Sequence, residues 1–345
     1  MKINNKSKRI NIGLQLLRMI LCYWVIFVHV VPKIINKRFR NNLSLKHYHV
    51  PSFMLISFYF YYRHLKNRDI NKIILRFKRL LTPYLLWPLI YMIINNLGFI
   101  INNNFGIYKK FLSPKDYFSQ LIGADYYAST FWYLQVVLFI SLLFTICAFL
   151  FRNKFLLIIQ LFGIVIYRIH RSQIYIILKK IYFFRLFFVC FIRMMPIAIV
   201  GMTFCSINFE INSKKNYLKY LFINLVSLYF LFSFQLFNIN DEGIKMYADV
   251  DSNILAAINM FYFFSLLPLS NIKNKKVLLF IKLITNHTGG IYYLHPLIIL
   301  ILGKITKFVK YRTIFGTILI YIYTYFFCFI GNLLFNKSFL KFLFN

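Results

Sequence analysis

The feature that most constrains this chain is a succession of long apolar runs, separated by short connections that carry basic and polar residues. A helix needs about 20 apolar residues to cross the hydrocarbon core of a bilayer, and somewhat fewer where neighbouring spans shield it. Ten such runs lie at 12–32, 50–65, 80–101, 130–151, 155–167, 186–206, 217–237, 254–270, 286–303 and 313–335. The sequence therefore predicts an all-α fold, a polytopic transmembrane helix bundle of about ten spans.

The composition agrees with a membrane protein and argues against a nucleic-acid-binding one. Of the 345 residues, 60% are hydrophobic and only 14% are charged, so a soluble domain could not cover its surface with polar groups. Lys and Arg outnumber Asp and Glu by 42 to 8, which gives a net charge of +34. These basic residues interrupt the apolar runs instead of forming one polar face, so we expect contact with membrane lipid and none with nucleic acid.

The cysteines argue against a disulfide framework and against a thiolate metal site. They lie far apart inside apolar runs, and no two of them form a Cys-x-x-Cys pair. We therefore expect core or lipid-facing thiols, no bound metal and no resident cofactor. The five cysteines are Cys22, Cys147, Cys190, Cys205 and Cys328.

Residues 1–345 are predicted to form a single integral-membrane domain that begins with a basic segment, 1–11. The first apolar run ends in Val31-Pro32-Lys33 and not in a small-residue cleavage site, so we expect an uncleaved anchor. The longest polar connection, 102–129, is too short and too rich in Asn to form a core of its own.

The Lys and Arg of the short loops favour a cytoplasmic N-terminus, because positive residues accumulate on the cytoplasmic side of membrane proteins. In this orientation the densest basic stretch, Arg63–Arg79, lies inside, and most of the acidic residues lie outside. The predicted location is the cytoplasmic membrane, with the chain crossing it many times.

Arg18 and His29 are the ionisable residues of the first span, and such residues usually face a bundle interior or a water-filled cavity. Their separation of eleven residues returns to within about 20° of the same helix face, about 16 Å further along. Both side chains would then point into one cavity suited to an elongated anionic ligand. The alternative is that Arg18 extends to the inner headgroups and His29 lies at the outer interface.

Arg76 and Arg79 lie three residues apart at the cytoplasmic start of the third span, and hence on one helix face. Paired guanidinium groups bind phosphate bidentately, so RFKRLLTPY is a candidate docking point for a phosphorylated cytosolic ligand. The simpler interpretation is an ordinary positive anchor at the cytoplasmic boundary.

Three further residues are candidates for lining a site. His295 lies mid-membrane in GGIYYLHP, with Tyr292 on the same helix face, although core packing is the commoner role for a single histidine. Trp132 in STFWYLQ is either part of a cavity or an aromatic residue of the membrane boundary.

Taken together, these segments resemble one family, the integral-membrane acyltransferase family 3, whose members O-acylate surface polysaccharides and related glycans. NIGLQLLRMILCYWVIFVHV is similar to its first-span signature, an Arg and a His with ten residues between them, matched here by Arg18 and His29. The other similar segments, in the expected order, are VPSFMLISFYF, RFKRLLTPYLLW, FWYLQVVLF and GGIYYLHPLI. Phe58 departs from the pattern, because the family often has Gly after the residue that corresponds to Ser57.

The resemblance implies an acyl donor, acetyl-CoA as co-substrate, that enters from the cytoplasm, and an acceptor hydroxyl on an extracytoplasmic glycan. Arg76 and Arg79 would bind the nucleotide phosphates, and Arg18 would stabilise donor groups deeper in the membrane. His29 would be the catalytic residue, as a general base or as a transient acyl carrier.

The acceptor side of the implied site is formed by the later segments. His295 and Tyr292 would orient the acceptor or stabilise the oxyanion, and Trp132 would stack on a sugar or close the cavity. We expect no appended extracytoplasmic domain, so the resemblance is to the stand-alone type of the family.

The alternative function is a transporter or flippase for a lipid-linked glycan or an acylated sugar, in which the same basic cavity would hold a pyrophosphate. A purely structural membrane subunit would give Arg18 and His29 no reason to share a face. The acceptor sugar, its hydroxyl, the acyl group beyond acetyl and the oligomeric state are not encoded in any of these motifs.

Overall fold

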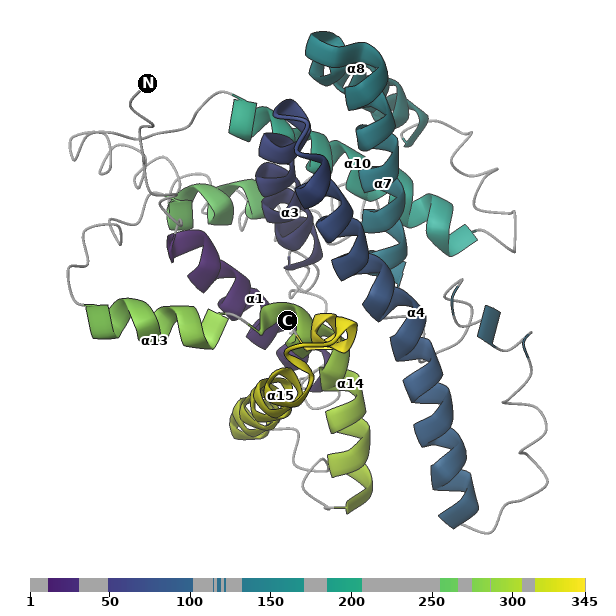
Figure 1. The fold of residues 1–345 in the computed structure, drawn as a ribbon, viewed down its shortest axis with the longest axis vertical. Helices are drawn as coiled ribbons and strands as arrows, with labels where there is room; N and C mark the ends of the chain where they lie inside the picture. Colours follow the sequence, from purple (N-terminus) through teal and green to yellow (C-terminus); the bar gives the residue numbers. More distant parts are fainter. Residues whose placement is uncertain are drawn as a thin grey trace, which may run out of the picture.

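The computed structural model describes residues 12–30, 49–101, 114, 117–118, 121, 132–170, 185–206, 255–265, 275–285, 287–305 and 314–344. All of the secondary structure in these residues is helical, which confirms the all-α prediction for the part of the chain that is described (Figure 1). The number of spans and the side on which the N-terminus lies stay predictions.

The helices follow the apolar runs closely. They are α1 (Ile12–Val30), α3 (His49–Lys66), α4 (Ile70–Ile101), α7 (Trp132–Phe151), α8 (Phe155–His170), α10 (Arg185–Ser206), α13 (Lys275–Thr285), α14 (Thr288–Ile305) and α15 (Ile314–Phe335), with 3₁₀ turns η5 (Arg152–Lys154) and η8 (Phe339–Leu343). A further apolar helix covers Leu255–Ser265. The predicted span 217–237 and the end of the span 254–270 lie outside the described residues.

Two elements differ from the predicted pattern. The third span was expected from residue 80, whereas α4 begins at Ile70, because the basic segment before the apolar run continues the same helix. Helix α13 was not expected as an element, since its 11 residues are too short and too basic to cross a bilayer.

Three helical segments of the described chain are long and apolar enough to cross a membrane: Ile12–Val30, Trp132–Ile166 and Phe315–Phe335. Large apolar side chains also line the outer faces of the helices, as on α4, where exposed residues recur every four positions. These residues are Leu81, Leu85, Leu89 and Ile93. The long apolar helices and the apolar outer surface indicate a membrane protein.

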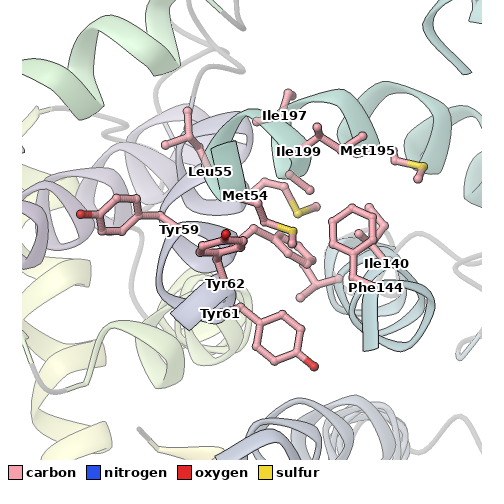
Figure 2. Packing of buried hydrophobic residues seen from close by; sticks show 14 of the residues in the cluster. Met54, Leu55, Tyr59, Tyr61, Tyr62, Ile140, Phe144, Met195, Ile197 and Ile199 are labelled. Carbon is pink, nitrogen blue, oxygen red and sulfur yellow. The ribbon is translucent and has the colours of Figure 1, made fainter. Parts of the chain in front are cut away.

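The larger of two buried clusters lies where α3 packs between α7 and α10 (Figure 2). Its largest members are aromatic, and Phe58 meets Phe144 edge to face with ring centroids 5.3 Å apart. Gly201 of α10 faces the Leu55 carbonyl so closely that an added Cβ would clash with the backbone of α3. The labelled side chains of Figure 2 are Met54, Leu55, Tyr59, Tyr61, Tyr62, Ile140, Phe144, Met195, Ile197 and Ile199.

The second cluster joins α1, α14 and α15 with the C-terminal turn η8. Phe344 returns to this cluster, where its ring stacks on Phe335 with centroids 5.7 Å apart and its carbonyl lies 3.0 Å from His287 Nδ1. Figure 1 shows α14 and α15 together at the lower end of the molecule, and the long α4 running past them. The late helices α14 and α15 therefore pack against the first described helix, α1.

A tight turn connects α3 to α4 and sets the direction of α4. Arg68 has φ 48° in this turn, and Asp69 caps the new helix by accepting a hydrogen bond from the Lys72 backbone N–H at 3.3 Å. The Lys72 ammonium donates to the same carboxylate, and this hydrogen bond lowers the pKa of Asp69. The cap thereby aligns the part of α4 that carries Arg76 and Arg79.

Candidate functional site

Arg18 and His29 lie on one side of α1, where Arg18 is half-buried and His29 is exposed. The helix is unbroken from Ile12 to Val30, so the two residues keep the register that their spacing predicted. Cys22 and Val25, which lie between them on the same side, are 1% and 2% exposed. The Cys22 thiol donates a hydrogen bond to the Thr288 carbonyl at 3.2 Å, so this side of α1 faces α14. That Arg18 and His29 share one cavity stays a prediction.

His29 meets His295, which belongs to α14 and to the other end of the sequence. The two ring centroids are 5.2 Å apart and the ring planes are inclined by 39°. His295 is 1% exposed, whereas His29 is exposed. The Nδ1 atom of His295 lies 3.2 Å from the Ile291 carbonyl, which holds the ring in a fixed orientation.

The ring contacts continue from His295 to α7. Tyr292 meets His295 with centroids 6.1 Å apart, and Tyr133 meets Tyr292 at 5.5 Å. Trp132 in turn meets Tyr133 at 6.2 Å. We call this series of rings, which is contributed by α1, α14 and α7, the aromatic series. Its members are His29, His295, Tyr292, Tyr133 and Trp132.

Tyr133 is a member of the site that sequence reasoning missed. It follows Trp132 directly in FWYLQ, and adjacent helix residues point about 100° apart, so naming Trp132 as a candidate did not imply a role for Tyr133. The contact with Tyr292 is a tertiary one between α7 and α14, and no spacing within either segment predicts it.

Arg76 lies inside the bundle at the junction of α3, α4 and α7. Its Nη2 donates to Ser57 Oγ at 2.9 Å and to Ser141 Oγ at 3.2 Å, and its Nε donates to the same Ser141 oxygen at 3.2 Å. The guanidinium carbon also lies 4.1 Å from the Tyr61 ring centroid and 5.1 Å from that of Phe58. Hydrogen bonds and aromatic faces therefore surround this charge on three helices.

No carboxylate among the described side chains compensates the charge of Arg76. The ion pair found in this part of the chain joins Lys72 to Asp69 at the start of α4. A half-buried guanidinium that contacts only neutral groups keeps its positive charge uncompensated, and Tyr133 and Tyr293 both lie close enough to interact with that charge. The arrangement therefore presents positive charge toward the aromatic series.

Arg79 and Arg18 add to this positive field. Arg79 is exposed, unlike Arg76, and its charge interacts with that of Arg18. The Arg18 charge acts in turn on Tyr133 and Tyr293. The two arginines of α4 thus have different surroundings, and their joint binding of one phosphate group stays a prediction.

Arg193 of α10 is a further basic residue near the site. Its Nε atom is buried and has no hydrogen-bond partner among the described residues. Arg193 lies near Cys190, and Cys190 lies near Tyr292 of the aromatic series. In the described part of the chain, no group of three His, Cys, Asp or Glu residues is placed to hold a metal ion.

The arrangement can therefore present two imidazoles and several aromatic faces beside a positive field. Residues 11–335 match the family model of an acyltransferase domain. Neither the curated proteins nor the solved structures gave a match.

Proposed function

Because the chain belongs to acyltransferase family 3, we propose that this membrane acyltransferase transfers acetyl from cytoplasmic acetyl-CoA to a hydroxyl of an extracytoplasmic glycan. The acceptor would be a cell-surface polysaccharide or its lipid-linked precursor. We further propose that the chain is a multi-pass protein of the cytoplasmic membrane, in contact with lipid, and that it works without nucleic acid, metal or a resident cofactor.

The observation that carries this proposal is the aromatic series. Two helices that are distant in sequence, α1 and α14, place His29 in contact with His295 and its neighbour Tyr292, and Tyr133 and Trp132 extend the contact to a third helix, α7. An acyl transfer needs a base or nucleophile beside a surface that can hold the acceptor. The aromatic faces can stack on a sugar ring, and a histidine can act as the base or the nucleophile of the transfer.

The donor would approach from the side of the arginines. In this proposal Arg79, which is exposed, binds phosphates of the CoA nucleotide, and Arg76 strengthens the positive field behind it. Arg18 lies about 16 Å from His29 along α1, so it would contact a deeper part of the same donor. The thioester would then lie at His29.

The reaction needs one proton to move twice. In the base mechanism, the unprotonated nitrogen of His29 takes the proton of the acceptor hydroxyl while the oxygen attacks the thioester carbonyl carbon. The carbon–sulfur bond then breaks, and His29 returns the proton to the CoA sulfur. In the carrier mechanism, the same nitrogen attacks the thioester carbonyl carbon, and the carbon–sulfur bond breaks to release the CoA thiolate. The acceptor oxygen then takes the acetyl group from the nitrogen, and the hydroxyl proton passes to the CoA sulfur.

The remaining side chains would bind the acceptor. Tyr292 and His295 would orient its hydroxyl or stabilise the developing oxyanion, and Trp132 would stack on the sugar. Tyr133 joins this group because it contacts Tyr292 directly.

Purified protein incubated with acetyl-CoA labelled in the acetyl group tests the proposal. The acceptor is surface glycan from the native cells from which O-acetyl groups have been removed by alkali. We expect label in the glycan and free CoA in equal amounts. Translocation of a lipid-linked glycan with neither label transfer nor release of CoA would contradict the proposal and favour the flippase alternative.

A further inference from the structure

Two imidazoles from opposite ends of the sequence lie side by side, and only one of them is enclosed. The ring centroids of His29 and His295 are 5.2 Å apart. His295 is 1% exposed, whereas His29 is exposed. The first ring can therefore meet a substrate, and the second cannot do so without movement of its surroundings.

The hydrogen bonding of His295 determines which of its nitrogens carries a proton. Nδ1 lies 3.2 Å from the Ile291 carbonyl, and a carbonyl oxygen can only accept. Nδ1 of the neutral ring therefore carries the hydrogen, and Nε2 keeps its lone pair. This Nε2 atom is buried and has no hydrogen-bond partner among the residues that the structure describes.

We propose that His295 is a positioning residue for acyl transfer, whose Nε2 accepts a hydrogen bond from the ring N–H of His29. This bond would fix the tautomer of His29 and aim its other, unprotonated nitrogen at the acceptor hydroxyl, the logic by which a partner group orients a catalytic histidine. Hydrogen bonds between catalytic groups are often long before substrate binds and tighten in the complex. Rotation of the exposed His29 ring toward His295 would form the proposed hydrogen bond from the His29 ring N–H to Nε2.

The proposal rests on the proposed function and takes His29 as the base. The oxygen–hydrogen bond of the acceptor breaks, its proton passes to the unprotonated nitrogen of His29, and the oxygen forms a bond to the acetyl carbon. The carbon–sulfur bond breaks, and the proton passes from His29 to the sulfur to give free CoA. His295 neither gains nor loses a proton, because it only accepts the hydrogen bond that becomes stronger while His29 is positive.

Two amide substitutions separate this role from a structural one. The amide nitrogen of His295→Asn can replace Nδ1 as donor to the Ile291 carbonyl, but it leaves no acceptor near Nε2. The amide oxygen of His295→Gln reaches the region of Nε2 and can accept from His29, but the donor to Ile291 is lost. A structural role favours the Asn variant, and the positioning role favours the Gln variant.

His287, which directly precedes the first residue of the same helix, offers a matched control. It is 3% exposed, and its Nδ1 pairs with a backbone carbonyl, that of Phe344, at 3.0 Å. Its ring contacts Tyr325 and Phe329 of α15 and not the aromatic series. His287→Asn and His287→Gln therefore report the effect of the same substitutions on the fold alone.

The experiment measures kcat and the KM for acetyl-CoA with purified protein and saturating de-O-acetylated glycan, together with the melting temperature of each variant. We expect His295→Asn to lower kcat about 10- to 100-fold at an unchanged KM, and His295→Gln to recover most of that loss. The His287 variants should keep the kcat of the wild-type protein.

Three results would overturn the inference while the wild-type protein still transfers acetyl. These are a higher kcat in His295→Asn than in His295→Gln, equal losses in the two variants, and no loss in either. Absence of transfer by the wild-type protein would instead contradict the proposed function, and the inference with it.

Discussion

Arg76 and His295 are both polar side chains enclosed by apolar helices, but they differ in how much of their hydrogen-bonding capacity is used. The guanidinium of Arg76 donates to Ser57 and Ser141 and lies against two aromatic rings. His295 uses Nδ1 alone, and its Nε2 receives nothing from the described residues. The first site belongs to the cluster around α3, and the second to the cluster around α14.

This difference in hydrogen bonding distinguishes a structural site, which holds helices together, from a reactive site. A buried polar group whose partners are all present rigidifies the helices that supply them, because losing any partner leaves an unpaired group. A buried group with an unused acceptor stabilises the fold less, but it is available for a proton or a ligand. We therefore expect substitutions at Arg76 to act mainly on stability and substitutions around His29 and His295 to act mainly on turnover.

The largest expected effect is on turnover, at His29. His29→Ala should lower acetyl transfer by about 10²- to 10⁴-fold, the usual contribution of a general base, and should leave the melting temperature nearly unchanged because the side chain is exposed. The measurement is the O-acetyl content of surface glycan in cells that express equal amounts of each protein. Undiminished acetylation would show that His29 has no part in the mechanism. The proposed difference between His29, which acts on turnover, and Arg76, which acts on stability, would then be wrong.

Arg76→Met should have the next largest effect, and it should fall on stability. The substitution leaves the hydroxyls of Ser57 and Ser141 without their donor and removes the contact with Tyr61, at a cost of about 2 to 4 kcal/mol. Thermal unfolding in detergent provides the measurement. Arg79→Met is the matched control on the same helix.

Arg79 should respond in the opposite way. Its side chain is exposed, so Arg79→Met should preserve the melting temperature and raise the KM for acetyl-CoA severalfold. Equal melting temperatures for Arg76→Met and Arg79→Met would show that Arg76 does not hold the helices together. An unchanged KM for acetyl-CoA in Arg79→Met would indicate that Arg79 serves only as a positive anchor at the membrane boundary.

Gly201→Ala tests how closely α10 packs on α3 in the cluster around α3. The new Cβ meets the Leu55 carbonyl, which is backbone and cannot rotate away, so we expect a loss of about 1 to 3 kcal/mol. Gly163→Ala is the control, because its Cβ meets the tip of the Ile199 side chain, which can adopt another rotamer. Similar melting temperatures for the two variants would argue against close packing of α10 on α3.

The sequence was sufficient to predict what depends on one helix. The apolar runs predicted most of the helices, and the spacing of Arg18 and His29 predicted their common side on α1. The start of α4 was missed, because a helix that projects beyond the membrane loses its apolar signal while its backbone hydrogen bonds continue.

What the sequence could not provide is the pairing between helices. Arg76 and Arg79 share a face by their spacing, yet Arg76 is enclosed by serines that lie 19 and 65 residues away. The meeting of His29 with His295 and the place of Tyr133 likewise depend on how α1, α7 and α14 pack, and no local pattern records it.

An electron cryomicroscopy structure of the protein with acetyl-CoA tests the central claim most directly, because it places the thioester relative to the two histidines. The account predicts the thioester carbon beside the His29 ring, His29 within hydrogen-bond reach of His295 Nε2, and the nucleotide phosphates near Arg79. Acetyl-CoA bound away from both histidines, with the His29 ring directed at lipid, would contradict it.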